Sequence, residues 1–329
     1  MSDVHTLDVH TVSWEMTEPF TIARGTQTHV DGIVVTLSDG AHAGRGEAYG
    51  ISYEGESPAA MLAQIESARE RIEAGLTREE LLDLLPNGGA RCAVDFALWD
   101  LAAKHGGIPA WRLAGVPGWD ALDTTLTIGM RSRAAVSELA ARCKGYRMLK
   151  IKVGADDPVD VLRAVREAAP GPRLIVDPNQ SWSIDQLRDL APQCAELGVV
   201  LIEQPLAVGQ DEGLEGYRCP VALAADESIR DVADLPGASG KYDVINIKLD
   251  KAGGLTAGLR LANAALAQGY RLMIGCMAGS SLSMAPGFVV GQLCDYVDLD
   301  GPLLQKEDWP HGIRYENGRM TPPSPLLWG

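Results

Sequence analysis

Hydrophobic residues follow strand periodicity near the N-terminus and helical periodicity after it. Alternating apolar and polar residues up to about position 57 predict antiparallel strands in the segments TLDVHTVSW, GIVVTLSD and HAGRGEAYG. Apolar residues then recur at helical spacing at positions 61, 62, 65, 68 and 72. The run ARCAVDFALWDLAAK predicts a second, buried helix that ends at Gly106-Gly107. We therefore expect an α+β module over residues 1–118.

From about residue 119 onward, short apolar runs alternate with helical segments. The runs that predict strands are TTLTIGM, MLKIKV, LIVDPN, VVLIEQP, VALAADES, VINIKLDK, RLMIGCM and DYVDLDG. The clearest helices between them are DVLRAVREAA, IDQLRDLAPQCAEL and LTAGLRLANAALAQ. Parallel strands joined by right-handed helical crossovers close into a barrel. We expect an α/β fold, a modified TIM barrel of the (β/α)7β type over residues 119–303, with the first module as its N-terminal capping domain. The proline-rich segment 304–329 is expected to return toward the cap.

Six ionisable residues lie at or near the ends of consecutive strand-like runs. They are Lys150, Lys152, Asp177, Glu203, Asp226 and Lys248. The steps from Lys152 onward are 25, 26, 23 and 22 residues, each long enough for a crossover. Because the C-terminal ends of barrel strands meet at one rim, we expect all six side chains around one pocket.

Asp177, Glu203 and Asp226 predict a metal site. Any one of them alone is as easily explained as a solvated strand end, but three at matched depth in consecutive units favour a shared cation. Carboxylate oxygens suit a hard divalent ion, so Mg²⁺ is the expected cofactor, with Mn²⁺ as the alternative. The histidines lie outside the strand ends, at positions 5, 10, 29, 42, 105 and 311. We therefore expect no zinc or iron site built from histidine or cysteine.

The lysines predict proton transfer. Lys150 and Lys152 share one face of a strand, and the apolar residues between and beside them are expected to pack outward under helices. Lys248 comes four strands later, on the opposite wall of an eight-stranded barrel. One lysine could remove a proton beside a metal-held carboxylate, through an enediolate, and the other return it on the opposite face. The residue types alone do not choose between epimerisation, cycloisomerisation and β-elimination.

Composition narrows the class of protein. A formal charge of −15 and a pI near 4.8 argue against nucleic-acid binding and against a basic membrane-surface role. The six cysteines are scattered, as in a cytoplasmic enzyme with reduced thiols. No stretch approaches 18 apolar residues, so no membrane partner is expected.

With these residues in place, the chain resembles the enolase superfamily, in its muconate lactonizing enzyme-like subgroup. The motifs that carry the resemblance are KIK (150–152), VDPN (176–179), EQP (203–205), ADES (225–228), NIKLDKAGGL (246–255) and GCM (275–277). Within that subgroup the chain looks most like the dipeptide epimerases that interconvert L-Ala-D-Glu and L-Ala-L-Glu. The feature that favours them is VDLDG, which contains Asp298 and Asp300. Pro178 in VDPN and the loop GISYEGES (50–57) depart from the family pattern.

The resemblance implies an isomerase with assigned roles along the chain. Lys152 and Lys248 would exchange the α-proton of the C-terminal residue of a dipeptide, and Lys150 would add positive charge. Substrate would be bound by Asp298 and Asp300 at its ammonium, by Arg24 in the mobile loop FTIARGT (20–26) at the glutamate side chain, and by Cys276 and Met277.

The biological role that the resemblance implies is turnover of peptidoglycan peptides. The rival activities are N-acylamino acid racemase, o-succinylbenzoate synthase and muconate cycloisomerase, whose substrates carry no ammonium for the acidic pair. A metal-binding module without catalysis is a further alternative, against which the full set of catalytic residues argues. The sequence does not determine the oligomeric state, and a homo-oligomer is one of the alternatives.

Overall fold

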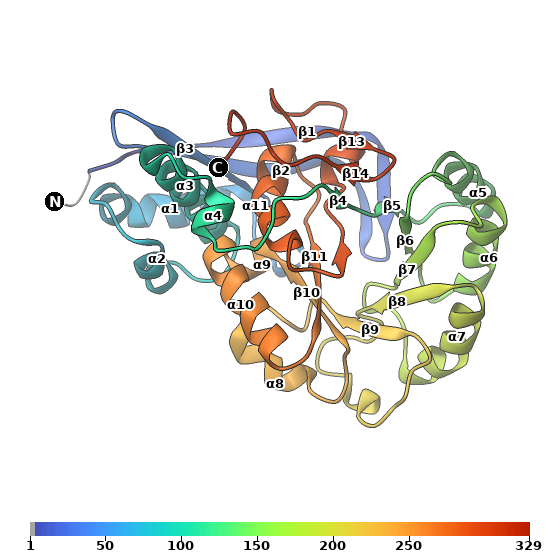
Figure 1. Ribbon diagram of the computed structural model, residues 1–329. Coiled ribbons are helices and arrows are strands. Elements are labelled where there is room, and N and C mark those ends of the chain that lie inside the picture. Colours follow the sequence, from blue (N-terminus) through green and yellow to red (C-terminus); the bar gives the residue numbers. More distant parts are fainter. Residues whose placement is uncertain (1–3) are drawn as a thin grey trace.

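The computed structural model describes residues 4–329, which form an N-terminal α+β region packed against a barrel of parallel strands (Figure 1). The N-terminal sheet has the order β1-β2-β3 and is antiparallel. Its strands are β1 (Thr6–Ile22), β2 (Gly25–Ser38) and β3 (Ala43–Ala48). The helices that follow are η1 (Ser52–Glu54), α1 (Pro58–Glu73), α2 (Arg78–Leu84), α3 (Gly89–Gly106) and α4 (Ala110–Leu113), where η denotes a 3₁₀ helix. The predicted strands and helices of this region are confirmed.

Helix α3 is the centre of the N-terminal region because its residues are buried on nearly all sides. Strand β3 lies directly on it. A Cβ added at Gly46 would come within 2.1 Å of the Ala93 carbonyl oxygen, so only glycine permits this approach. The helix ends as expected, with Gly107 in the left-handed conformation at φ 61°.

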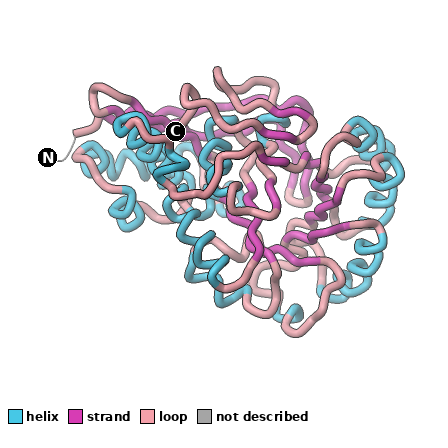
Figure 2. Tube along the Cα trace, in the orientation of Figure 1, coloured by secondary structure: helices cyan, strands magenta, loops and turns pink. Residues whose placement is uncertain are grey.

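The barrel sheet contains eight parallel strands in the order β12-β11-β10-β9-β8-β7-β6-β5. Its strands are β5 (Leu126–Ile128), β6 (Met148–Lys152), β7 (Arg173–Asp177), β8 (Val199–Glu203), β9 (Ala222–Ala225), β10 (Val244–Lys248), β11 (Arg271–Gly275) and β12 (Tyr296–Val297). The connecting helices are α5 (Arg133–Arg142), α6 (Pro158–Ala168), α7 (Ile184–Glu196), α8 (Leu235–Ala238), α9 (Leu249–Ala252), α10 (Leu255–Ala267) and α11 (Ser281–Gly291). The expected modified TIM barrel is confirmed, and Figure 2 shows helices outside the curled set of strands.

Two features distinguish this barrel from a regular one. The connection from β8 to β9 carries only η2 (Glu212–Leu214), and the next has only η3 (Val232–Asp234) and the four-residue α8. The first and last strands of the sheet meet through one backbone hydrogen bond, from the Thr125 N–H to the Val297 carbonyl at 2.9 Å, and through side-chain hydrogen bonds between residues 124–127 and 297–300. The barrel is therefore closed by side-chain as well as backbone hydrogen bonds.

The inner face of the strands forms a closed apolar floor. Alternate residues point inward, and one from each of seven strands joins a separate buried cluster: Met148, Ile175, Leu201, Ala224, Val244, Met273 and Tyr296. Residues of the other parity, among them Leu149, Ile151 and Val153, belong to the large core under the helices. The predicted outward packing around the lysines of β6 is confirmed.

The C-terminal segment contacts the N-terminal region. Its elements are η4 (Gly301–Leu304), β13 (Tyr315–Glu316) and β14 (Arg319–Met320), the last paired with β4 (Leu122–Asp123). The Trp328 indole N–H donates to the Phe96 carbonyl at 3.1 Å, and the Gly329 N–H donates to Asp100 at 2.7 Å. Contacts also cross the expected boundary at residue 118, where Trp119 stacks on Trp111 at 5.8 Å. The domain limits therefore stay predictions.

No helix among residues 4–329 combines the length and the apolar character that a membrane crossing requires.

Candidate active site

A cavity of about 730 Å³ lies between the N-terminal region and the C-terminal ends of the barrel strands. The N-terminal region contributes residues such as Arg24 and Tyr53 to its lining, and the barrel contributes Lys150, Lys152 and Lys248. Polar groups from both parts of the chain therefore face one space.

The polar site follows directly from strand periodicity. Each apolar residue of this floor is followed, two positions later, by the next residue that faces inward. One of these seven residues is Gly275, and the other six carry polar side chains: Lys150, Asp177, Glu203, Asp226, Asn246 and Asp298. The acids Asp177, Glu203 and Asp226 come from the adjacent strands β7 and β8 and the residue after β9, and all three are fully buried. The lysines rather than these acids line the cavity.

Lys150 lies at the centre of the buried charges. Its ammonium is 2.8 Å from Asp298 Oδ2, 2.7 Å from Glu203 Oε2 and 3.1 Å from Asp177 Oδ2. Burial lowers the pKa of Lys150, but the Asp298 and Glu203 carboxylates outweigh burial and raise it well above its usual value. Lys150 is thus a fixed cation, bound by three carboxylates.

Lys152 and Lys248 reach the cavity from strands four places apart in the sheet. The Lys152 ammonium lies 2.5 Å from Asp177 Oδ2, and the Lys248 ammonium lies 2.6 Å from Asp226 Oδ2. Gly275 on the neighbouring strand leaves room for Lys248, because an added Cβ would be 3.1 Å from its Cε. The structure therefore brings both predicted bases to one cavity.

Two polar residues near these acids had no role assigned from sequence. The Lys251 ammonium donates to Asp226 Oδ1 at 2.6 Å, to the Asp226 carbonyl and to the Ile229 carbonyl. Asn246 donates to Glu203 Oε1 at 2.9 Å. Both residues lie inside the NIKLDKAGGL motif: Asn246 faces the barrel interior from β10, and Lys251 follows this strand. Their place in that motif could have identified them as residues of the site.

The cluster has an excess of acceptor oxygens and of negative charge. Within residues 4–329, buried oxygens without a hydrogen-bond donor include Asn179 Oδ1, Glu227 Oε2 and Asn246 Oδ1. Burial and the neighbouring Asp177 raise the pKa of Glu203 to about 8. Oxygen acceptors in excess, with no thiolate or imidazole among them, fit a hard divalent cation.

The three acids do not approach one another at the spacing of ligands on one ion. In the described part of the chain, only Asp39, His42 and His105 place three ligand atoms within 4.8 Å of one another. At the barrel rim, ammonium groups separate the carboxylates. A turn and a helix end that are distant in sequence bring these three side chains together outside the barrel, a grouping that was not predicted from the sequence.

Asp298 and Asp300 follow β12 rather than lying on it. Asp298 accepts hydrogen bonds from the Thr125 hydroxyl at 2.5 Å and from Lys150, and Asp300 accepts from the Thr127 backbone N–H at 2.5 Å. Burial and the charge of Asp298 raise the pKa of Asp300 to about 7. Both residues line the cavity, as do Cys276 and Met277 directly after β11.

Arg24 occupies the two-residue turn between β1 and β2, at the tip of the hairpin. The rest of FTIARGT is paired strand rather than loop, since Ile22 pairs with Gly25 and Thr21 with Thr26. The Arg24 guanidinium donates to Glu227 Oε1 at 2.7 Å and lies 4.5 Å from the centre of the Tyr53 ring. The hairpin thus brings one arginine onto the barrel rim beside Asp226.

The segment 49–57 over the cavity is held by two carboxylates. Asp250, in α9 after β10, accepts from the backbone N–H groups of Tyr49 and Gly50 at 2.8 and 3.2 Å. Glu56 accepts from the N–H groups of Ile51 and Gly89. This segment includes the loop that departs from the family pattern. The contacts to Asp250 and Gly89 were not predicted because these residues are distant from the loop in sequence.

Glu47 joins three parts of the chain. This fully buried carboxylate accepts from the indoles of Trp14 and Trp309, both at 2.8 Å, and from the hydroxyls of Tyr49 and Ser280. Its donors come from β1, the end of β3, the start of α11 and the C-terminal segment. Burial raises the pKa of Glu47 despite these hydrogen bonds.

Comparison with known families gives two matches that together cover most of the chain. Residues 4–115 match the mandelate racemase / muconate lactonizing enzyme N-terminal domain, and residues 133–325 match the enolase C-terminal domain-like family. Among curated relatives, an L-Ala-D/L-Glu epimerase of Escherichia coli is 37% identical over 96% of this chain and 99% of its own length. An N-acetyl-D-glutamate racemase of Pseudoalteromonas is also 37% identical, over 90% of this chain and 95% of its own.

Solved structures give the same picture. An enolase family member from Agrobacterium tumefaciens with homology to dipeptide epimerases, containing sodium and L-Ala-L-Glu, has a TM-score of 0.96 at 43% identity, covering 99% of this chain and all of its own. A dipeptide epimerase from Methylococcus capsulatus, complexed with Mg and L-Arg-D-Lys, has a TM-score of 0.90 at 31% identity, covering 96% of each chain.

Proposed function

The chain belongs to the mandelate racemase / muconate lactonizing enzyme family of the enolase superfamily, and from this premise we propose that it is a Mg²⁺-dependent dipeptide epimerase with L-Ala-D/L-Glu as its preferred substrate. One observation carries the proposal: two lysines from opposite walls of the barrel reach one cavity above three buried carboxylates. That arrangement suits removal of a proton from one face of a carbon atom and its return to the other.

Asp177, Glu203 and Asp226 are the residues that would hold the divalent cation. When bound, this ion supplies positive charge where the substrate carboxylate gains negative charge. Lys150, fixed by its three carboxylates, adds a further positive charge at the same place. Both effects favour ionisation at the adjacent carbon.

Lys152 and Lys248 are the acid and base of the reaction. In one direction the amine of one lysine accepts the α-proton of the C-terminal residue, and the ammonium of the other donates a proton to the opposite face. The carbon is inverted without any net change in bonds. In the reverse direction the two lysines exchange roles. After each turnover the base carries a proton and the acid has lost one, and exchange with solvent returns both lysines to their starting states.

The remaining charged residues select the substrate. Asp298 and Asp300 bind the free ammonium of the N-terminal residue, which relieves the repulsion between the two carboxylates. Arg24 binds the side-chain carboxylate of glutamate, replacing or sharing its contact with Glu227. Cys276 and Met277 line the wall of the same cavity.

Racemisation of an N-acylated glutamate is the second candidate. It is favoured by the relative that acts on N-acetyl-D-glutamate and by the Lys150–Asp298 contact, which already gives one acid of the pair a cation. Such a substrate has no ammonium, so Asp298 and Asp300 would contribute nothing to its binding.

We place this activity in the cytoplasm, in agreement with six free cysteines among the described residues. The implied biological role is the turnover of peptidoglycan peptides.

Exchange in D₂O with Mg²⁺ tests the proposal. L-Ala-L-Glu, L-Ala-D-Glu, both enantiomers of N-acetylglutamate and L-Ala-L-Leu would each be incubated with the enzyme, and deuterium at the α-carbon followed by mass spectrometry and NMR. We expect exchange and epimerisation of both Ala-Glu epimers, and slower reaction of the other compounds. Faster exchange of N-acetylglutamate would favour the second candidate, and no exchange of any substrate would refute both.

A further inference from the structure

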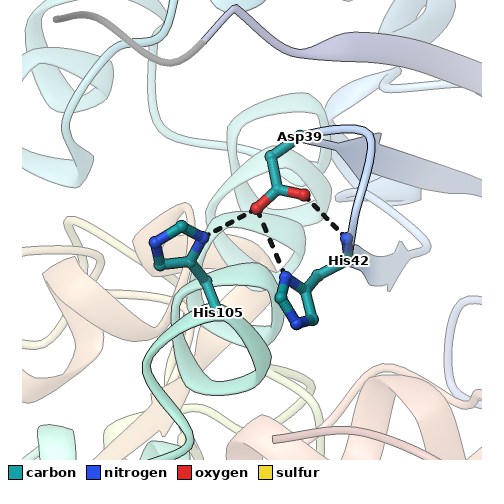
Figure 3. A group of neighbouring side chains, drawn as sticks. All are labelled: Asp39, His42 and His105. Atoms are coloured by element: carbon teal, nitrogen blue, oxygen red, sulfur yellow. Dashed lines mark hydrogen bonds and ion pairs between the residues drawn. The ribbon is translucent and has the colours of Figure 1, made fainter.

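We propose that Asp39, His42 and His105 form a second metal site, separate from the barrel, that takes a borderline divalent transition metal such as Zn²⁺. The three residues lie on the N-terminal region: Asp39 and His42 in the turn between β2 and β3, and His105 in the last turn of α3. Figure 3 shows both imidazole rings directed at the Asp39 carboxylate.

The distances among the three side chains suit one small ion. His105 Nδ1 lies 2.8 Å and His42 Nδ1 lies 3.6 Å from the same oxygen, Asp39 Oδ2. Ligands about 2.0–2.1 Å from a tetrahedral Zn²⁺ are about 3.3 Å apart, a value between these two distances. The two rings meet edge to face, 5.7 Å between centroids at 69°, and one ligand atom from each of the three residues lies within 4.8 Å of the other two.

Asp39 is held in place for this role. Its other oxygen, Oδ1, accepts from the backbone N–H groups of Ala41 at 2.8 Å and His42 at 2.7 Å. A metal-bound carboxylate is commonly fixed in this way by donors to its second oxygen.

The position at the end of α3 favours a cation. This helix has 18 residues, and His105 is in its last turn, where the aligned peptide dipoles leave partial negative charge. Lys104, in the same turn, already links the helix end to the sheet by donating to the carbonyl of Ala43, the first residue of β3, at 3.0 Å. A metal ion would add a second link between the β2–β3 turn and the helix.

The chemistry of the donors selects the class of metal. Two imidazoles and one carboxylate suit Zn²⁺, Ni²⁺, Co²⁺ or Cu²⁺ and not the hard ion expected at the barrel. The side chains are partly exposed, and His105 is 60% accessible, which leaves room for one or more water ligands. A structural site that stabilises the N-terminal region is the role we infer.

Zn²⁺ titration tests the proposal. The enzyme, freed of transition metals and kept in saturating Mg²⁺, would be titrated by calorimetry and by competition with a chromophoric chelator at pH 7.5. We expect one Zn²⁺ per chain, weakened at least 10-fold in His42→Ala and in His105→Ala. Bound Zn²⁺ should raise the melting temperature by a few degrees, and Co²⁺ should give the visible absorption of a four-coordinate nitrogen and oxygen site.

His10→Ala is the matched control. His10 is also exposed and also faces an acid, with 3.3 Å from its Nδ1 to Asp8 Oδ2, but no third ligand is grouped with this pair within the described chain. Its Zn²⁺ affinity should equal that of the wild type. Asp39→Asn removes a ligand charge but keeps the oxygen that accepts the backbone hydrogen bonds of the turn, so it tests the site even if an alanine variant misfolds. Equal Zn²⁺ affinity in the wild type and all three ligand variants, or no saturable binding in the wild type, would overturn the site.

Discussion

Lys152 on β6 and Lys248 on β10 stand on opposite walls of the barrel, and each ammonium is paired with a different acid, Asp177 or Asp226. The two amines therefore approach the cavity from different sides. A substrate carbon between them would have one lysine on each face, which is the geometrical requirement for inversion.

Removing either lysine should stop epimerisation. We expect Lys152→Ala and Lys248→Ala each to lower kcat by about 10²–10⁴-fold, the usual contribution of a positioned acid or base. Each variant should lose deuterium exchange mainly from the epimer whose α-proton faces the missing amine, as read by NMR in D₂O. Lys306→Ala, an exposed lysine paired with Glu15 at 2.5 Å, is the control and should keep wild-type rates. Identical loss of exchange from both epimers in both variants would contradict a division of faces.

Arg24 should determine the preference for glutamate. Arg24→Ala is expected to lower kcat/KM for L-Ala-L-Glu by about 100-fold, the scale of one lost charge-assisted hydrogen bond, and to change L-Ala-L-Leu by less than about threefold. The measurement is a comparison of kcat/KM for the two dipeptides. Arg131→Ala is a suitable control, because Arg131 pairs with Glu18 on β1 at 2.8 Å and is not among the residues that line the cavity. An equal loss for both dipeptides would assign Arg24 a structural role instead.

Binding of dipeptides should depend on the ionisation of Asp300. Burial and Asp298 raise the pKa of Asp300 to about 7, so this acid gains a proton as the pH falls through neutrality. The pair then loses one negative charge that attracts an ammonium, and kcat/KM for L-Ala-L-Glu should fall on the acid side. Asp300→Asn should lower kcat/KM at pH 8 and lose this acid limb. The same limb in wild type and variant would show that another group titrates.

Stability should fall with rising pH through Asp95. This acid of α3 accepts hydrogen bonds from the Thr256 backbone N–H at 3.0 Å and hydroxyl at 2.6 Å, at the start of α10. Burial raises its pKa from 3.8 to about 6, so the folded chain holds the proton that the unfolded chain has lost between these values. The stabilisation that Asp95 contributes is fully present below its pKa in the unfolded chain, 3.8, and is lost as the pH rises to about 6.

The test is urea unfolding of wild type and Asp95→Asn at pH 4.5 and pH 7. Between pH 4.5 and pH 7 the free energy of unfolding of the variant, relative to wild type, should rise by ~2 kcal/mol, at about 1.4 kcal/mol per pH unit up to pH 6. A difference that does not change with pH would show that Asp95 is ionised in both states.

The barrel, and the order along it of the candidate catalytic and metal-binding residues, could be predicted from the sequence because both depend on local repeats. Apolar runs at regular intervals give the strands, and an inward residue at each C-terminal end gives the site, as with Asp177 and Glu203. The pairing of Lys150 with three acids was not predictable, because it depends on the depth of each side chain. Other contacts were missed because the tertiary fold joins residues that are distant in sequence, among them those of Asp250, Glu47 and the Asp39–His42–His105 group.

Glu47 has a consequence for how such proteins diverge. Its four donors lie on β1, just after β3, at the start of α11 and in the C-terminal segment, so the N-terminal region, the barrel and the C-terminal segment meet at this carboxylate. A chimera that grafts a foreign cap onto this barrel would leave the indole of Trp309 and the hydroxyl of Ser280 facing a mismatched partner. Exchanging cap modules between relatives should therefore succeed only when these positions travel together, whereas changes confined to the hairpin tip can alter substrate choice freely.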